Sequence, residues 1–232
     1  IDDIINIRGK GGAVAGLRAP IKFGMITAVA FVAGLFFYYK LGYNTVQLPY
    51  FGDVALSWAI IPLFVFVVVG TGNAVNITDG VDGLAGGLLV SAYGAFGVIA
   101  ALQGNFGIAT FCMTVVGALL AYLWFNIPPA RFVMGDVGSF ALGTSLGVVA
   151  MLTDTLLLLP LICVIFVAEA GSVIIQIFSK KVFHRRVFIS SPLHHHLEAT
   201  GWPKTKVTMR FWVIGQVVAA LGVVLALIGG YV

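Results

Sequence analysis

The sequence is poor in charge. Lys, Arg, Asp and Glu together make up 9% of its 232 residues, whereas hydrophobic residues make up 60%, and the mean hydropathy is +1.06. A soluble domain carries about 25% charged residues, because its surface must be hydrated. The composition therefore excludes an ordinary soluble domain and predicts an integral membrane protein.

Cysteine is also scarce, and both cysteines, Cys112 and Cys163, fall inside apolar runs. We expect them to act as small buried hydrophobic residues, and no disulfide is predicted. The sequence begins Ile-Asp-Asp, without an initiator methionine and without the cationic and apolar parts of a signal peptide. We therefore expect that further sequence precedes it.

Long apolar runs dominate what is present. A bilayer core of about 30 Å needs roughly 20 helical residues to cross, and backbone that faces lipid must be helical because it finds no water there. One all-α membrane domain over residues 1–232 is predicted, with about seven transmembrane helices near 20–39, 55–74, 83–102, 106–125, 137–153, 155–178 and 207–230.

The basic residues are divided unequally between the two sides that alternating spans would create. Lys40 alone lies on one side, and twelve residues lie on the other: Arg8, Lys10, Arg18, Lys22, Arg131, Lys180, Lys181, Arg185, Arg186, Lys204, Lys206 and Arg210. Because cytoplasmic loops are rich in Lys and Arg, the second side is predicted to be cytoplasmic. Its segments are 1–19, 75–83, 126–136 and 179–206, and we expect the chemistry there.

Two of these segments hold closely spaced acids. Asp2 and Asp3 suit metal or phosphate-proton chemistry, although a solvated turn would also explain them. Asn76, Asp79 and Asp82 recur at spacing three, which predicts one helix face. Carboxylates so close together at a membrane edge repel each other and are poorly solvated, so a ligand is a good reason for them.

The segment from Asn126 to Asp136 contains two adjacent prolines, which break any helix, so the next span should begin near Asp136. An aspartate at this position can cap the helix. It can equally bind Mg²⁺, which favours one or two carboxylates together with phosphate oxygens and water. The segment alone leaves both interpretations open.

Three consecutive histidines, His194, His195 and His196, lie in the last cytoplasmic segment. Adjacent side chains on a helix cannot all reach one ion, and neither a nearby cysteine nor a second histidine at i+4 is present, so zinc is not predicted. Donation to phosphate oxygens fits better, helped by the upstream run Lys-Lys-Val-Phe-His-Arg-Arg.

The sixth predicted span contains Glu169, Ser172 and Gln176, which share a helix face. Ionisable residues in a span face the bundle interior, so Glu169 is expected to bond another helix, and Gln176 is a possible ligand contact. A transporter would carry ionisable residues along several spans, but only Glu169 lies deep in one. The gathering of polar motifs on one side favours an enzyme over a transporter. A piece that is non-catalytic because it is incomplete stays an alternative.

Four stretches carry a family resemblance: NITDGVDGLAGG, PARFVMGDVGSFALG, AEAGSVIIQ and SPLHHHLEATGWPKTKVTMRFW. They resemble the phospho-N-acetylmuramoyl-pentapeptide transferases, within the polyprenyl-phosphate N-acetylhexosamine-1-phosphate transferases. Relatives that use N-acetylglucosamine generally interrupt the histidine run, so the unbroken run favours the muramoyl branch. The resemblance covers the chain from Asp2 to near Val232 and implies a ten-helix fold that lacks its first three helices here.

The resemblance implies transfer of the phospho-sugar of UDP-N-acetylmuramoyl-pentapeptide to undecaprenyl phosphate, which yields lipid I and UMP and requires Mg²⁺. It implies a homodimer in the lipid bilayer of the bacterial inner membrane, with the site facing the cytoplasm and with no nucleic-acid partner. Direct attack by the lipid phosphate is expected, and a covalent phospho-aspartate route is the alternative.

The resemblance also implies roles for individual residues. Asp2 and Asp3 match the family's aspartate pair, with Asp2 as acceptor of the lipid phosphate's proton, and Asp136 matches the Mg²⁺ ligand. The family commonly has Phe two residues before the glycine of Met-Gly-Asp, where Val133 stands here, so Phe132 is the candidate to stack on uracil. The other implied substrate contacts are Asn76, Asp79, Asp82, Asn126, Gln176, His194, His195 and His196.

Overall fold

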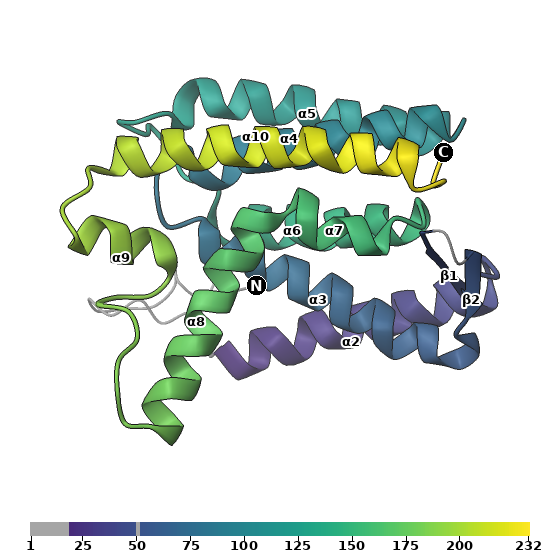
Figure 1. The fold of residues 1–232 in the computed structure, drawn as a ribbon, viewed down its shortest axis with the longest axis horizontal. Helices are drawn as coiled ribbons and strands as arrows, with labels where there is room; N and C mark the ends of the chain where they lie inside the picture. Colours follow the sequence, from purple (N-terminus) through teal and green to yellow (C-terminus); the bar gives the residue numbers. More distant parts are fainter. Residues whose placement is uncertain (1–18, 50–51) are drawn as a thin grey trace, which may run out of the picture.

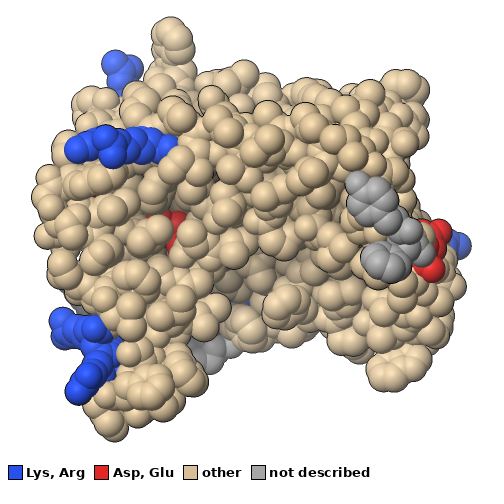
Figure 2. All heavy atoms as spheres, viewed as in Figure 1, with Lys and Arg blue, Asp and Glu red and all other residues tan. Residues whose placement is uncertain are grey.

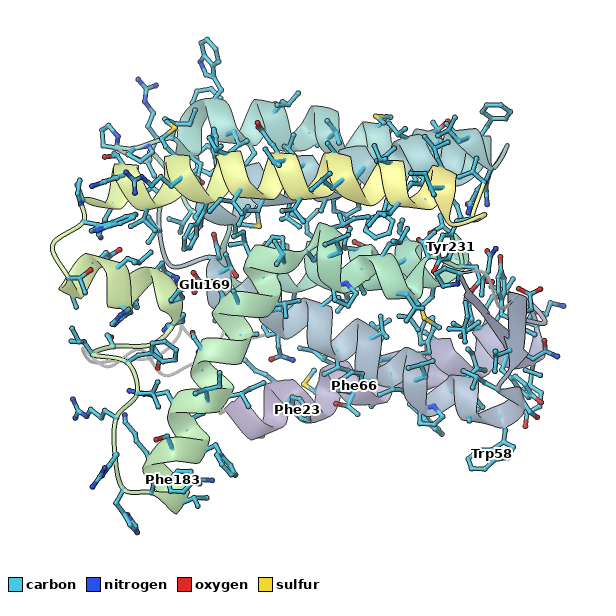
Figure 3. The ribbon with its side chains drawn as sticks, viewed as in Figure 1. Phe23, Trp58, Phe66, Glu169, Phe183 and Tyr231 are labelled. Carbon is cyan, nitrogen blue, oxygen red and sulfur yellow. The ribbon has the colours of Figure 1, made fainter. Side chains whose placement is uncertain are left out.

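A computed structural model describes residues 19–49 and 52–232 (Figure 1). Six of its helices are long and apolar enough to cross a membrane, which confirms the prediction of an all-α membrane protein. They are α2 (Ala19–Tyr39), α3 (Ile60–Thr78), α4 (Leu84–Leu102), α5 (Phe106–Asn126), α6 (Gly135–Leu152) and α10 (Lys204–Ile228). Large apolar side chains such as Phe66 and Trp58, 75% and 70% exposed, project outward, as lipid-facing residues would (Figure 3).

The span predicted near 155–178 is present as a bent pair of helices and not as one straight helix. Residues Leu156–Leu158 form the short helix η2, Leu159–Ile162 form α7, and α8 (Val164–Val182) leaves α7 at an angle of 81°. The break lies at Cys163, whose φ of −99° and ψ of 27° fall outside the helical range. The bend carries the polar face of α8 toward the short helix α9 (Leu193–Ala199).

A small β-hairpin, which the sequence did not indicate, lies between α2 and α3. Strand β1 (Thr45–Leu48) pairs antiparallel with β2 (Gly52–Ala55), and a turn of 3₁₀ helix, η1 (Ser57–Ala59), follows. Helix α3 therefore begins at Ile60, and the apolar helical segment that could cross a membrane runs from Ser57 to Thr78, close to the predicted start near residue 55. The backbone N–H of Gln47 donates to Asp154 Oδ1 and its side chain to the Gly230 carbonyl, so the hairpin joins three segments at this end.

Helices α3 and α6 lie unusually close because glycines form their contact. A Cβ atom on Gly143 would lie 2.7 Å from the Thr71 carbonyl oxygen, and one on Gly147 would lie 2.5 Å from Thr71 Oγ1. Small residues allow helix backbones to approach in this way. The spacing matters for function because α3 and α6 each carry acidic or amide residues at the same end.

Basic residues mark that end of the molecule, hereafter the basic end. Figure 2 shows Lys and Arg mostly at one end of the long axis, where an acidic side chain is also visible, and Asp and Glu beside a single basic group at the other end. The described basic residues near helix ends and loops at the basic end are Lys22, Arg131, Lys180, Lys181, Arg185, Arg186, Lys204, Lys206 and Arg210. The hairpin and the C-terminus lie at the opposite end (Figure 1).

Candidate functional site

The turn between α3 and α4 brings two of the predicted acids together, but not as one helix face. Helix α3 ends at Thr78, Asp79 has a non-helical ψ of 42°, and Gly83 has a left-handed φ of 76° before α4 begins. The expectation that Asn76, Asp79 and Asp82 lie along one helix is therefore wrong for both acids. Gly83 is the N-cap of α4, and its left-handed φ, which glycine adopts without strain, keeps the two helices from forming one continuous helix.

Asp136 is the meeting point of three elements at the basic end. It lies in the first turn of α6, and its carboxylate accepts Asn76 Nδ2 from α3 at 3.0 Å and Lys22 Nζ from α2 at 2.6 Å. Asn76 Nδ2 also donates to Ser139 Oγ at 2.9 Å. Asp136 is not the helix cap, because the N-cap is Met134 and no side chain caps this helix. Its side chain is 46% exposed and accessible to a ligand.

Asp79 lies close enough to Asp136 for the two carboxyl groups to repel each other when both are charged. The pKa of Asp79 is raised to about 6, chiefly by burial and also by the nearby charges of Asp136 and Asp82, against a hydrogen bond from the Gly135 backbone that lowers it. A carboxyl group is destabilised in its charged form when it loses water and gains anionic neighbours. The site therefore concentrates negative charge that a bound cation would neutralise.

Asn126 and Asp82 connect the α3–α4 turn to the loop between α5 and α6. Asn126 is buried; its Oδ1 accepts the Gly83 N–H at 2.9 Å, and its Nδ2 donates to the Phe132 carbonyl at 2.9 Å. Asp82 Oδ2 accepts the Ala130 N–H at 3.3 Å. In this structure, Asn126 holds the polypeptide that surrounds the site, and its predicted substrate contact stays a prediction.

Phe132 lies beside an apolar cavity of about 340 Å³ whose lining includes Tyr122, Val133 and Met134. Its ring is half exposed and contacts the rings of Tyr122 and Phe125, with centroids 5.5 and 5.9 Å apart. The structure thus gives Phe132 an accessible face next to a cavity. A larger groove of about 740 Å³ lies among α2, α3 and α6, but its purely apolar lining offers no group for a phosphate.

The polar face of α8 is buried as predicted. Glu169, Ser172 and Gln176 are all buried on it. Glu169 bonds α9, which confirms the expected structural contact: its Oε1 accepts the His194 backbone N–H at 3.1 Å, and its Oε2 lies 2.9 Å from His194 Nδ1. Gln176 Oε1 accepts the N–H groups of Val187 and Phe188, so its amide holds the loop after α8.

The three histidines occupy different surroundings. His194 is 1% exposed, whereas the side chain of His195 is 43% exposed and has Nδ1 3.3 Å from Glu198 Oε2. His196 Nδ1 accepts the Ile189 N–H at 3.2 Å. No group of three or more His, Cys, Asp or Glu side chains close enough to share a metal ion is found in the described part of the chain.

Comparisons with known proteins show which family this chain resembles. Residues 1–154 match the model of glycosyl transferase family 4. The chain is 44% identical over 243 residues to phospho-N-acetylmuramoyl-pentapeptide-transferase of Chloroflexus aurantiacus, covering 99% of this chain and 66% of that protein. It is 44% identical over 227 residues to the protein of the same name from Geobacillus kaustophilus, covering 96% and 68%. The chain belongs to the phospho-N-acetylmuramoyl-pentapeptide transferase family.

The chain matches only part of the length of its relatives. The chain spans about two thirds of the length of these transferase relatives, 66% and 68% in the two cases. A third relative, from Bacillus mycoides, is 51% identical over 168 residues that make up 72% of this chain. The predicted aspartate pair, Asp2 and Asp3, lies outside the described residues, so its place in the transferase site stays a prediction.

Several residues that contact the candidate site are not indicated by the sequence motifs. Lys22 was counted only as a topological charge, yet it pairs with Asp136. Ser139 receives the second hydrogen atom of the Asn76 amide, and Trp212 Nε1 donates to the Gly83 carbonyl at 3.1 Å. The spacing of Asp136 and Ser139, one helical turn apart, was the available signal for Ser139. Trp212, 129 residues from Gly83, had no local signal.

Proposed function

We propose that this chain carries the catalytic site of a Mg²⁺-dependent transferase. The reaction moves phospho-N-acetylmuramoyl-pentapeptide from its UDP conjugate to undecaprenyl phosphate and yields lipid I and UMP. The proposal rests on the surroundings of Asp136 at the basic end. Its carboxylate accepts hydrogen bonds from Asn76 and Lys22, and its charge acts on the nearby carboxyl group of Asp79. Family membership supports the reaction class.

The donor set at the basic end fits Mg²⁺. Asp136 is half exposed, and it lies close enough to Asp79 to raise the pKa of that carboxyl group. A hard cation with one or two carboxylates, completed by phosphate oxygens and water, is the usual protein environment of Mg²⁺. Asp136, supported by Asp79, would hold the ion. Bound there, Mg²⁺ would neutralise charge on the diphosphate and on departing UMP.

The residues of the chain have a positioning and neutralising role in the proposed step. An oxygen of the lipid phosphate forms a bond to the sugar-linked phosphorus of the UDP conjugate. The bond from that phosphorus to the bridging oxygen breaks, and UMP leaves with the electron pair. Phosphoryl transfer of this kind needs alignment and charge neutralisation more than a protein nucleophile. Lys22 and the accessible histidines would supply cationic or N–H donors, and Asp2 would accept a proton from a protonated lipid phosphate.

Further parts of the proposal follow from the position of the site. Phe132, beside its cavity, would offer an aromatic face to the uracil ring. The excess of Lys and Arg at the basic end favours a cytoplasmic site, in the inner membrane of a bacterium, within a homodimer. Transport is disfavoured because, among the described residues, only Glu169 is an acid deep within a helix of the bundle, and it bonds His194.

The activity test uses protein expressed from the complete gene and reconstituted in lipid vesicles with both substrates. Asp136→Asn should lower the rate of UMP and lipid I formation about 100-fold or more, because it removes a charge that acts on the transferring phosphate. Asp53→Asn is the matched control, since Asp53 is exposed on β2 at the opposite end. Unchanged turnover in Asp136→Asn would refute the proposed role.

Two further measurements separate the alternatives. Omitting undecaprenyl phosphate and searching for a phosphorylated aspartate distinguishes direct attack from the covalent route, because only the covalent route forms that species. Replacing the donor with UDP-N-acetylglucosamine distinguishes the two branches of the superfamily. Equal turnover of that donor would contradict the muramoyl assignment.

A further inference from the structure

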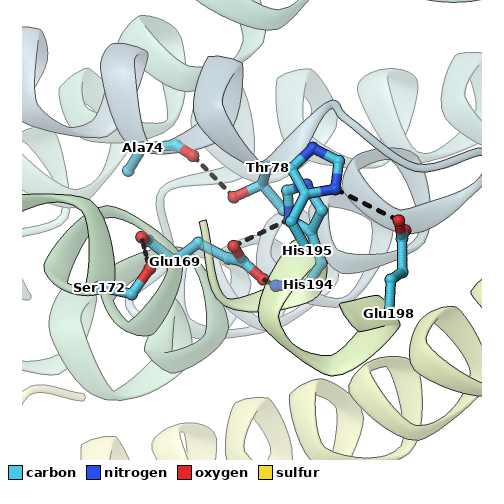
Figure 4. A network of polar contacts seen from close by, with 7 residues as sticks. All are labelled: Ala74, Thr78, Glu169, Ser172, His194, His195 and Glu198. Atoms are coloured by element: carbon cyan, nitrogen blue, oxygen red, sulfur yellow. Dashed lines mark hydrogen bonds and ion pairs between the residues drawn. The ribbon is translucent and has the colours of Figure 1, made fainter. Parts of the chain in front are cut away.

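A buried contact between Glu169 and His194 connects α8 and α9 (Figure 4), and the His194 ring also lies against the α3–α4 turn. Glu169, which is fully buried, directs both carboxylate oxygens at His194: one takes the backbone N–H at 3.1 Å and the other lies 2.9 Å from ring Nδ1. The single side chain of Glu169 thus fixes the start of α9 and the orientation of the imidazole ring. Figure 3 shows Glu169 on the inner side of α8.

The far edge of the His194 ring rests on Gly80. Its Nε2 atom is buried and has no hydrogen-bond partner among the described residues. A Cβ atom built on Gly80 would lie 2.6 Å from Nε2 and 3.1 Å from Cε1, both shorter than the 3.4 Å at which ordinary contact begins. Only glycine fits at position 80, because the Cβ atom of any other residue would press against the His194 ring. Substrate could reach Nε2 only if the turn moved away.

We infer that Glu169 and His194 are positioning residues that form a buried support beneath the α3–α4 turn and hold Asp79 and Asp82 in place. Gly80, the point of contact, lies in the chain directly after Asp79 and two residues before Asp82. A shift of Gly80 would therefore displace both acids from Asp136 and Ala130. The inference rests on the proposed function, and it removes His194 from the groups that touch substrate.

The other two histidines are then the ones available to substrate. His195 is partly exposed. His196 accepts the Ile189 N–H at Nδ1, which places its own ring hydrogen on Nε2 when the ring is neutral, where it can donate to a phosphate oxygen. The His194 ring has no edge accessible to substrate. Its Nδ1 lies against Glu169, and its Nε2 packs against Gly80.

A double substitution distinguishes support from direct contact. His194→Phe keeps a ring on Gly80 and the backbone N–H on Glu169 Oε1, but it leaves Glu169 Oε2 buried without its Nδ1 partner, so kcat/KM for lipid I formation should fall about 100-fold through displacement of the turn. Adding Glu169→Gln replaces the carboxyl group by a neutral amide and keeps an acceptor for the backbone N–H. The double variant should then recover at least about tenfold of the loss, as buried pairs replaced by neutral groups often remain stable.

The outcome of this comparison is decisive in both directions. A folded double variant that stays as inactive as His194→Phe would overturn the inference, because an imidazole nitrogen would then be needed for the reaction itself. Gly80→Ala offers a second route, since its Cβ would push against the ring; about 100-fold lower kcat/KM is expected. Gly171→Ala is its control, because Gly171 lies in α8 with open space around its Cβ position and should leave activity unchanged.

Hydrogen exchange of the protein without substrates keeps this test separate from the proposed function. Glu169→Gln and Gly80→Ala should each accelerate amide exchange in residues 79–83 about tenfold, while exchange in α5 stays unchanged. Exchange rates in the turn that match those of the wild type would overturn the inference that Glu169 and His194 hold the turn in place. If wild-type protein formed no lipid I, the proposed function would fail, and the exchange result would still decide the inference.

Discussion

The closeness of α3 and α6 makes a strong prediction at Gly143. In Gly143→Ala the new Cβ would lie 2.7 Å from the Thr71 carbonyl oxygen, whereas ordinary contact begins at 3.4 Å. The neighbour is backbone and cannot rotate away, so the helices must separate by about the difference, 3.4 − 2.7 = 0.7 Å. Carried along α6, that shift would lengthen the Asn76–Asp136 hydrogen bond of 3.0 Å to about 3.7 Å, which is too long to persist.

We therefore expect Gly143→Ala to lower the free energy of unfolding by about 1–3 kcal/mol and to lower kcat/KM by tens of fold, since misplacement of about 1 Å can cost about 100-fold. Thermal unfolding in vesicles and the rate of UMP release measure the two effects. Gly70→Ala is the control, because Gly70 lies on α3 with nothing within 4 Å of its Cβ position. Wild-type stability and turnover in Gly143→Ala would refute the reasoning. A destabilised variant with normal turnover would refute only the link from helix spacing to site geometry.

Two other predictions address the charge and the loop of the site. Because the pKa of Asp79 rises from 3.8 to about 6 on folding, the folded protein binds this proton more tightly than the unfolded chain. The free energy of unfolding should therefore fall as pH rises from 3.8 to about 6 and should stay lowered above that range. Asp79→Asn should remove this pH dependence and raise Tm near pH 8, measured by thermal unfolding with a chelator present. A variant with the pH dependence of the wild type would contradict the prediction. Gln176→Leu strands the N–H groups of Val187 and Phe188, at about 1–3 kcal/mol for each. Amide exchange there should accelerate while turnover per folded molecule stays unchanged; a lower kcat at normal Tm would instead indicate substrate contact.

Helix positions were largely predictable because apolar run length and the width of a bilayer fix them together. The exceptions have physical causes that local sequence does not express. Cys163 interrupts the span between α7 and α8 without a proline or glycine at the break. The hairpin between α2 and α3 depends on bonds from Gln47 to Asp154 and Gly230, 107 and 183 residues away. Tertiary contacts at such distances leave no periodic pattern in a single sequence.

The candidate site was predictable as a set of residues but not as a geometry. Clustering of polar motifs on one side identified Asn76, Asp79 and Asp136, since a membrane protein has little reason to keep unpaired acids near lipid. The spacing of three suggested a helix, but α3 ends at Thr78, and the segment Asp-Gly-Val-Asp-Gly forms the turn that leads to α4. Its glycines were the available warning, because glycine adopts the left-handed φ that Gly83 shows just before α4.

The histidine run shows why composition alone could not assign roles. Successive residues on a helix point about 100° apart, so three adjacent imidazoles must face three different environments. Which environment each meets depends on Glu169, 25 residues before His194, and on the 81° bend that aims α8 at α9. The first histidine of the run therefore faces inward, onto Gly80, and only the next two remain accessible to a phosphate. In this protein, a run that looks like three equivalent ligands combines one buried support with two candidate donors.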